Sequence, residues 1–91
     1  MSLSELRERI DRIDERITAL FCERMGVSLE IAEYKRTHGI AVCDPERERM
    51  LLDRLEAASD AEMRRYTRAL YERIIALSRE YQHSIIDEEE K

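Results

Sequence analysis

Two cationic side chains share one face of the first helical stretch of this sequence. Arg24 takes a position where the surrounding pattern calls for an apolar residue, and Lys35 follows eleven residues later. Eleven steps of about 100° return to within roughly 20° of the same helix face, about 16 Å further along the axis. Such a pair could contact a bound anion from both ends. The alternative for Arg24 is a residue that sets the register of a helical seam, or a surface arginine.

Three further polar side chains interrupt apolar stripes. Glu48 is aligned with Leu51 and Leu55, where a carboxylate is costly to bury unless another group satisfies it. Ser78 and Gln82 are four residues apart and therefore share a helix face. Taken alone, Glu48 is better explained by an ordinary ion pair or a solvated helix start. Buried groups bonded to backbone or water explain the Ser78–Gln82 pair equally well.

Arg7 lies too far from Arg24 for both to reach one ligand. Seventeen residues separate them, or about 25 Å along a helix axis. Arg7 would therefore serve the site of another chain, or else be an ordinary surface arginine. Together, these residues describe a pocket with several cations, one carboxylate and two neutral hydrogen-bonding groups, without a nucleophile–base pair or a metal set. This combination favours binding of a polyanion, or a reaction that needs electrostatic help and no proton shuttle.

The composition predicts a single all-α domain over residues 1–91. Charged residues make up 41% of the chain and hydrophobic residues 43%, with only two Gly and one Pro to interrupt helices. The net charge of -5 disfavours a general nucleic-acid binder, although it does not exclude a local cationic pocket. The sequence has no 18-residue apolar run and no apolar signal core, so we expect no membrane contact and a cytoplasmic location. Cys22 and Cys43 belong to no metal-spaced cluster and are interpreted as free thiols.

The positioning elements are three helices, in the order long, short, long. Apolar residues recur in steps of three and four across residues 3–37, between a capping box at Ser2 and a stop at Gly39. Asp44 followed by Pro opens a second helix that ends near residue 58. Ser59 with Glu62 predicts a capping box for a third helix, and residues 86–91 are expected to be a frayed tail. The apolar stripe expected on the third helix is Met63, Tyr66, Leu70, Ile74, Leu77, Tyr81 and Ile85.

The length of the first helix predicts a second copy of the chain. A helix over residues 3–37 is about 50 Å long, at 1.5 Å per residue. A compact globule of this size is only about 30 Å across, given a radius of gyration near 12–13 Å. The first helix should therefore project beyond its own chain, and its apolar seam needs another chain to cover it. We expect an intertwined helical homodimer.

Taken together, these residues and elements resemble those of the all-helical chorismate mutases. The resemblance covers nearly the whole chain, in order and with family-like spacing, and its motifs are specific only as a set. The matching runs are Leu6-Arg7-x-x-Ile10-Asp11-x-Ile13-Asp14, Glu23-Arg24, Ile31-Ala32-x-Tyr34-Lys35, Val42-x-Asp44-Pro45-x-Arg47-Glu48 and Ile74-Ile75-x-x-Ser78-x-x-x-Gln82.

The resemblance implies a fold, a reaction and a mode of substrate binding. The fold is a three-helix protomer wrapped around its twin, with two sites per homodimer. The reaction is the pericyclic rearrangement of chorismate to prephenate, on the route to phenylalanine and tyrosine, with no cofactor and no metal. By this resemblance, Arg24 and Arg47 would hold the carboxylates of the substrate, and Arg7 would be supplied by the other protomer.

The resemblance also implies roles for the remaining site residues. Lys35 and Gln82 would face the ether oxygen whose bond to carbon breaks. Glu48 would accept a hydrogen bond from the ring hydroxyl. Asp44 and Ser78 would line the pocket, with Asp44 also capping the second helix.

Two alternatives remain open from the sequence. An isochorismate pyruvate lyase shares this fold and the cationic residues, but it need not keep the carboxylate of Glu48 or the small side chain of Ser78. Both are present here, which favours the mutase. A non-catalytic helical dimerisation module is the other alternative. It gives no reason for four residues to converge, namely Arg24, Lys35, Glu48 and Gln82.

Overall fold

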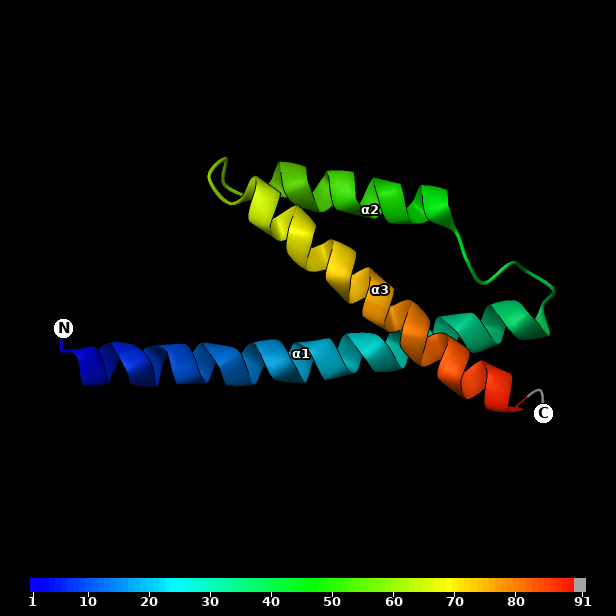
Figure 1. Ribbon diagram of the computed structural model, residues 1–91, viewed down its shortest axis with the longest axis horizontal. Helices are drawn as coiled ribbons and strands as arrows, with labels where there is room; N and C mark the ends of the chain where they lie inside the picture. The colour runs from blue at the N-terminus through cyan, green and yellow to red at the C-terminus, as the bar shows by residue number, and fades with distance from the viewer. Residues whose placement is uncertain (90–91) are drawn as a thin grey trace.

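The computed structural model describes residues 1–89, with side chains described as far as Asp87, and it contains three helices. α1 spans Leu3–Thr37, α2 spans Pro45–Ala58 and α3 spans Arg64–Glu89 (Figure 1). The all-α class and the three-helix order predicted from the sequence are confirmed. Among residues 1–89, no helix has both the length and the hydropathy needed to cross a bilayer.

Local capping explains where α1 and α2 begin and where α1 ends. The Ser2 hydroxyl accepts a hydrogen bond from the backbone N–H of Glu5 at 3.1 Å, which satisfies one of the free donors of the first turn. After α1, Gly39 adopts a φ of 67°, in the left-handed region that glycine enters without a Cβ penalty. Asp44 caps α2, because its Oδ1 accepts from the backbone N–H of Arg47 at 3.1 Å. The predicted ends of α1 and the start of α2 are therefore correct.

The predicted start of α3 is wrong by several residues. The hydroxyl of Ser59 donates to the carbonyl oxygen of Leu55 at 2.9 Å and lies 2.8 Å from the Thr67 hydroxyl. Ser59 therefore ends α2 and ties it to α3, and it does not form the capping box with Glu62. A turn follows, and α3 begins only at Arg64.

The far end of α3 is helical beyond the point where the sequence predicts a tail. The helix continues through residues 86–89, and the side chain of Ile86 is buried. Residues 90 and 91 of the predicted tail lie outside the described residues. The segment from 86 to 89 is therefore part of α3.

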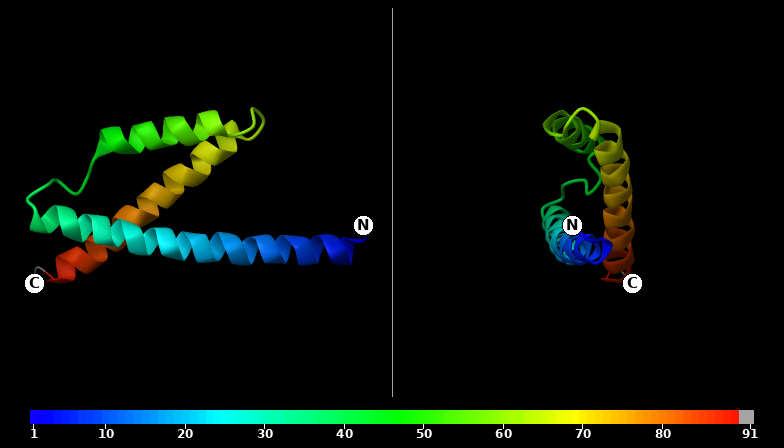
Figure 2. Two further views of the ribbon diagram at one scale, coloured as in Figure 1. Left: turned by 180° about the vertical axis from the view of Figure 1, so that it is seen from behind. Right: turned by 90° about the vertical axis from the view of Figure 1, so that its left-hand side faces the viewer.

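α3 is the element against which the other two helices pack. It crosses the C-terminal half of α1 and lies along α2 near their connecting turn, whereas α1 and α2 do not pack on each other within residues 1–89 (Figures 1 and 2). The small core lies at the α1–α3 crossing, where Ala32, Ile75, Ser78 and Ile86 are buried. The molecule measures 54 × 27 × 15 Å, with a radius of gyration of 16.5 Å. A compact chain of this length would have a radius of gyration of about 12 Å, so the protomer is elongated as predicted.

The N-terminal half of α1 projects away from the other helices (Figure 1), and its apolar face is exposed. Six apolar side chains there are each between 45% and 62% exposed: Leu3, Leu6, Ile10, Ile13, Ile17 and Leu20. The beginning of the stripe predicted on α3 is exposed as well, at Tyr66 and Leu70. The face of α3 that packs within the chain is instead the neighbouring one, which carries Ile75, Ser78 and Ile86. Within residues 1–87, the chain therefore leaves two apolar surfaces exposed.

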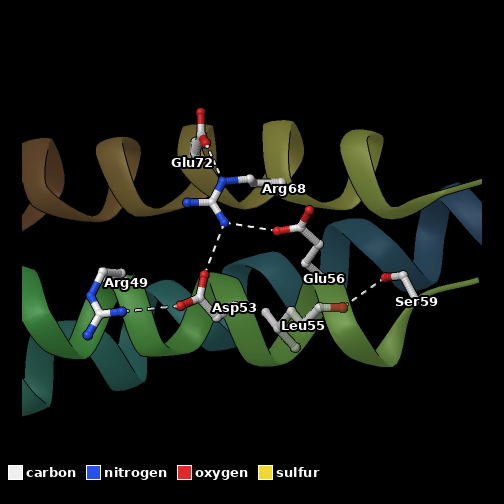
Figure 3. A network of polar contacts seen from close by, with 7 residues as sticks. All are labelled: Arg49, Asp53, Leu55, Glu56, Ser59, Arg68 and Glu72. Atoms are coloured by element: carbon white, nitrogen blue, oxygen red, sulfur yellow. Dashed lines mark hydrogen bonds and ion pairs between the residues drawn. The ribbon is translucent and has the colours of Figure 1, made fainter. Parts of the chain in front are cut away.

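A cluster of charged side chains joins α2 to α3 close to their connecting turn (Figure 3). Arg68 Nη1 lies 2.9 Å from Glu56 Oε2 and 3.3 Å from Asp53 Oδ1, and its Nε lies 3.2 Å from Glu72 Oε1. Hydrogen bonds to Glu56, and secondarily to Asp53, raise the pKa of the Arg68 guanidinium above its ordinary value. The guanidinium is therefore charged at every pH at which the protein would work, and it holds the two helices together at this end.

Candidate active site

A cavity of about 210 Å³ lies where α1, α3, the start of α2 and the α1–α2 connection meet. Each element contributes one face or segment. The lining residues are Arg24, Ser28, Ile31, Ala32, Lys35, Val42, Cys43, Asp44, Arg47, Glu48, Leu51, Ile75, Ser78, Arg79, Gln82 and His83. The α1 members of this set are separated by four, three, one and three residues, so one helix face supplies the whole α1 wall.

The two cations of α1 stand at the two ends of this wall. The Arg24 guanidinium donates from Nη1 to the Ser78 hydroxyl at 3.1 Å, and its Cζ lies 5.9 Å from the centre of the Tyr71 ring. Both contacts are with α3 and hold the arginine at the helix crossing. Lys35 Nζ lies 3.5 Å from the carbonyl oxygen of Val42, which belongs to the connecting segment. This long contact leaves the ammonium group with further hydrogens to donate.

α3 contributes the neutral hydrogen-bonding groups. Ser78 is only 5% exposed, and its hydroxyl is close to both Arg24 and the Met25 sulfur. The amide nitrogen of Gln82 lies 3.0 Å from the Ser28 hydroxyl oxygen and 3.3 Å from the Ser28 carbonyl oxygen. These contacts join α3 to α1 and fix the Gln82 side chain at the cavity wall.

The first turn of α2 supplies the acidic groups. Asp44 is occupied in capping the helix, since its Oδ1 accepts from the Arg47 backbone. Glu48 Oε2 lies 3.5 Å from Arg79 Nη2 on α3, and the Glu48 side chain is 25% exposed. Because the cap fixes the start of α2, it also fixes the direction in which this carboxylate enters the cavity.

The cavity is cationic although the chain as a whole is acidic. Four of its lining side chains are Lys or Arg and two are Asp or Glu, which leaves two positive charges in excess. The whole chain carries a net charge of -5. A cavity walled by low-dielectric protein concentrates such a local charge, so the cavity is complementary to a small dianion.

The comparison with protein families decides the assignment. The model of the chorismate mutase type II family matches residues 6–83. The chain belongs to this family. The matched range contains every residue that lines the cavity, and Arg7 as well.

Two curated relatives carry the chorismate mutase name, and a third is similar to the chain under another name. The chorismate mutase of Methanocaldococcus jannaschii is 43% identical over 53 residues, which cover 58% of this chain and 54% of that protein. The bifunctional chorismate mutase/prephenate dehydratase of Aquifex aeolicus is 42% identical over 53 residues, or 58% of this chain and 15% of that protein. The T-protein of Haemophilus influenzae is 36% identical over 58 residues, or 62% of this chain and 15% of its own length. The aligned segment thus spans about half of the first relative and a small part of the other two.

The structure brings together seven of the eight side chains that the resemblance to chorismate mutases singled out. These seven line the cavity: Arg24, Lys35, Asp44, Arg47, Glu48, Ser78 and Gln82. Arg7 does not, because it lies on the projecting half of α1. Its distance from the cavity of its own chain follows from the straight helix that separates it from Arg24.

Four further polar or ionisable side chains line the cavity, and the sequence did not predict them as site residues. They are Ser28, Cys43, Arg79 and His83. The spacing did place Ser28 on the face between Arg24 and Lys35, and that was the available signal. Arg79 and His83 directly follow Ser78 and Gln82 in the sequence. That proximity was the only sequence signal for them as site residues. Both cysteines are free and exposed. Within the described part of the chain, no group of three or more His, Cys, Asp or Glu side chains is arranged to hold a metal ion.

Proposed function

We propose that this chain is a chorismate mutase, which rearranges chorismate to prephenate. The observation that carries the proposal is the cationic cavity, in which residues from α1, α2 and α3 meet in the combination expected for this reaction. Membership of the family and the names of the relatives support it. The substrate is a small dianion, and the two positive charges in excess suit it.

Substrate binding is assigned to the arginines. Arg24 and Arg47 hold the two carboxylates, and the contacts of Arg24 with Ser78 and Tyr71 keep its guanidinium in place before the substrate arrives. The reaction involves one molecule and needs no covalent intermediate. Holding chorismate in its compact conformer therefore removes conformational freedom ahead of the barrier.

Rate acceleration is assigned to Lys35 and Gln82. As the carbon–oxygen bond breaks, negative charge develops on the ether oxygen, and both side chains donate hydrogen bonds to it. One preorganised donor of this kind can be worth roughly 3–4 kcal/mol in a dry site. In the free chain Gln82 Nε2 donates to Ser28, so at least one of its two hydrogens must turn from Ser28 to the ether oxygen when the substrate is bound. Glu48 accepts from the ring hydroxyl, and the reaction as proposed uses no cofactor or metal.

We further propose that the active form is an intertwined homodimer in which Arg7 of one protomer completes the site of the other. The six exposed apolar side chains on the N-terminal half of α1 support this. Each is about half exposed, so covering it contributes about 1 kcal/mol, given 1.5–3 kcal/mol for burying a whole side chain. Six such side chains on each of two chains are sufficient to drive association. The projecting N-terminal half of α1 would bring Arg7 to the site of the partner chain, since Arg7 cannot reach the site of its own chain.

The test is to incubate purified protein with chorismate, to follow the loss of chorismate absorbance and to identify the product. Prephenate is expected, at a rate that a chelator does not change. Recovery of pyruvate and an aromatic acid from isochorismate, with chorismate untouched, would assign the chain to the lyases. A folded protein that leaves both compounds unchanged would leave only a non-catalytic dimerisation module. The cytoplasmic location stays a prediction from the sequence.

A further inference from the structure

Arg79 lines the cavity but has no part in the proposed chemistry. It is on α3, between Ser78 and Gln82, and its Nη2 lies 3.5 Å from Oε2 of Glu48 on α2. Of the ion pairs that the structure describes, this one alone has both partners in the cavity wall. The contact therefore links a carboxylate of the candidate site to a side chain from the opposite wall.

Holding the fold together does not explain this ion pair. The side chains of Arg79 and Glu48 are 46% and 25% exposed, and pairs this open to solvent contribute little to stability. Moreover, α2 is already fastened to α3 near their connecting turn, by Arg68 and by the contact between Ser59 and Thr67. From that turn the two helices diverge, and Glu48 and Arg79 meet across the wider end (Figure 1).

The pair solves a problem that the bound substrate creates. Glu48 is an anion in a cavity proposed to take a dianion, so repulsion would push its carboxylate out toward solvent. Arg79 engages Oε2, and the described residues give the other carboxylate oxygen no partner of its own. A carboxylate held at one oxygen can present the second oxygen to a hydroxyl group in a fixed direction.

We propose that Arg79 is a positioning residue for Glu48: it anchors one carboxylate oxygen so that the other accepts from the substrate hydroxyl. The inference rests on the proposed function. The contrasting possibility is that Arg79 binds a substrate carboxylate directly, as one more cation of the pocket. The two differ in whether the effect of Arg79 depends on the charge of Glu48.

A double-mutant cycle separates them. We expect Arg79→Ala to lower kcat/KM about tenfold in the wild-type background and less than about twofold in a Glu48→Gln background, as for residues that act as a unit. Arg79→Lys should restore most of the loss, because an ammonium group can also engage the carboxylate. Arg73→Ala, an exposed arginine of α3 outside the cavity, is the matched control and should change neither kcat/KM nor the urea midpoint. Equal losses in both backgrounds, or no loss at all, would overturn the proposal.

A second readout keeps this proposal distinct from the proposed function. The ¹³C signal of the Glu48 side-chain carboxyl should move in Arg79→Ala and stay in place in Arg73→Ala, measured without substrate. A wild-type protein that makes no prephenate would refute the proposed function, while a shifted carboxyl signal would still support the anchoring of Glu48. An unmoved signal would refute the anchoring even if the wild type is active.

Discussion

The proposed sharing of each site between two chains can be tested by mixing two variants of low activity. Arg7→Ala removes the side chain that a protomer gives to its partner, and Lys35→Ala removes one that it keeps. In a mixed dimer, one site then lacks both side chains, whereas the other has both. Activity should therefore rise on mixing, above that of either variant alone.

The expected magnitudes follow from the structure. Arg7 is about 25 Å from Arg24 along a straight α1, so it cannot reach the cavity of its own chain. Loss of the Lys35 donor should cost about 3–4 kcal/mol, or roughly 10²- to 10³-fold in rate. Loss of the Arg7 contact with a carboxylate should cost about 1.5–3 kcal/mol, or roughly 10- to 150-fold. Random exchange makes half of the dimers mixed, each with one intact site, so about one quarter of the wild-type activity should appear.

The assay is chorismate consumption after the two variants are unfolded together in urea and refolded, with mass spectrometry to count mixed dimers. A mixture of Arg24→Ala with Lys35→Ala is the control. Both of these residues line the cavity of one chain, so each mixed dimer still has two defective sites. If mixed dimers form and the Arg7→Ala mixture gains no more than this control, the shared site is refuted. Each variant alone should keep the helical circular dichroism of the wild type.

Three further predictions concern the amide donor, the α2–α3 charge cluster and the exposed face of α1. Gln82→Glu should move activity toward acidic pH, because only a protonated carboxyl can donate to the ether oxygen; a pH–rate profile unchanged from the wild type would contradict the role of Gln82. Arg68→Ala should lower the urea midpoint more than Arg49→Ala, since the ion pairs that the structure describes for Arg49 all lie within α2, whereas Arg68 joins α3 to α2. Because the pKa of Arg68 is raised on folding, its contribution to stability is fully present at every pH below its unfolded pKa. The difference in urea midpoint between the two variants should therefore be the same at pH 6 and at pH 9. A difference that becomes smaller within this range would show that another group is responsible. Ile17→Glu should convert the dimer to monomer and abolish activity, whereas Thr18→Glu, on an adjacent helix position, should do neither; light scattering together with the activity assay decides this.

The helix ends could be predicted where the signal is local. The side chain of Ser2, the backbone of Gly39 and the carboxylate of Asp44 act on their own turns, so the sequence alone identifies them. Ser59 has the same local signature, yet its hydroxyl bonds with Leu55 and Thr67 instead. That choice depends on a contact between two helices, which no local pattern reveals.

The site could be predicted where a polar residue interrupts an apolar stripe, or where the family motif marks it. Ser78 and Gln82 are examples, and both line the cavity. Arg79 could not be recognised in this way, because arginines are frequent throughout the chain and its position has no unusual spacing. Only its contact with Glu48, 31 residues earlier, distinguishes it. The face of α3 that packs within one chain could not be predicted either, since periodicity cannot say which partner a face meets.

The exposed N-terminal half of α1 makes the stability of this protein depend on its concentration. Four of the side chains that the structure describes are buried, all near one helix crossing, so a single chain has little stability of its own. If the rest of its stability comes from a second copy of the chain, mass action governs folding. The melting temperature then rises with the protein concentration. On dilution, the catalytic pocket would then be lost together with the fold. Activity would therefore fall more steeply than in proportion to the enzyme concentration.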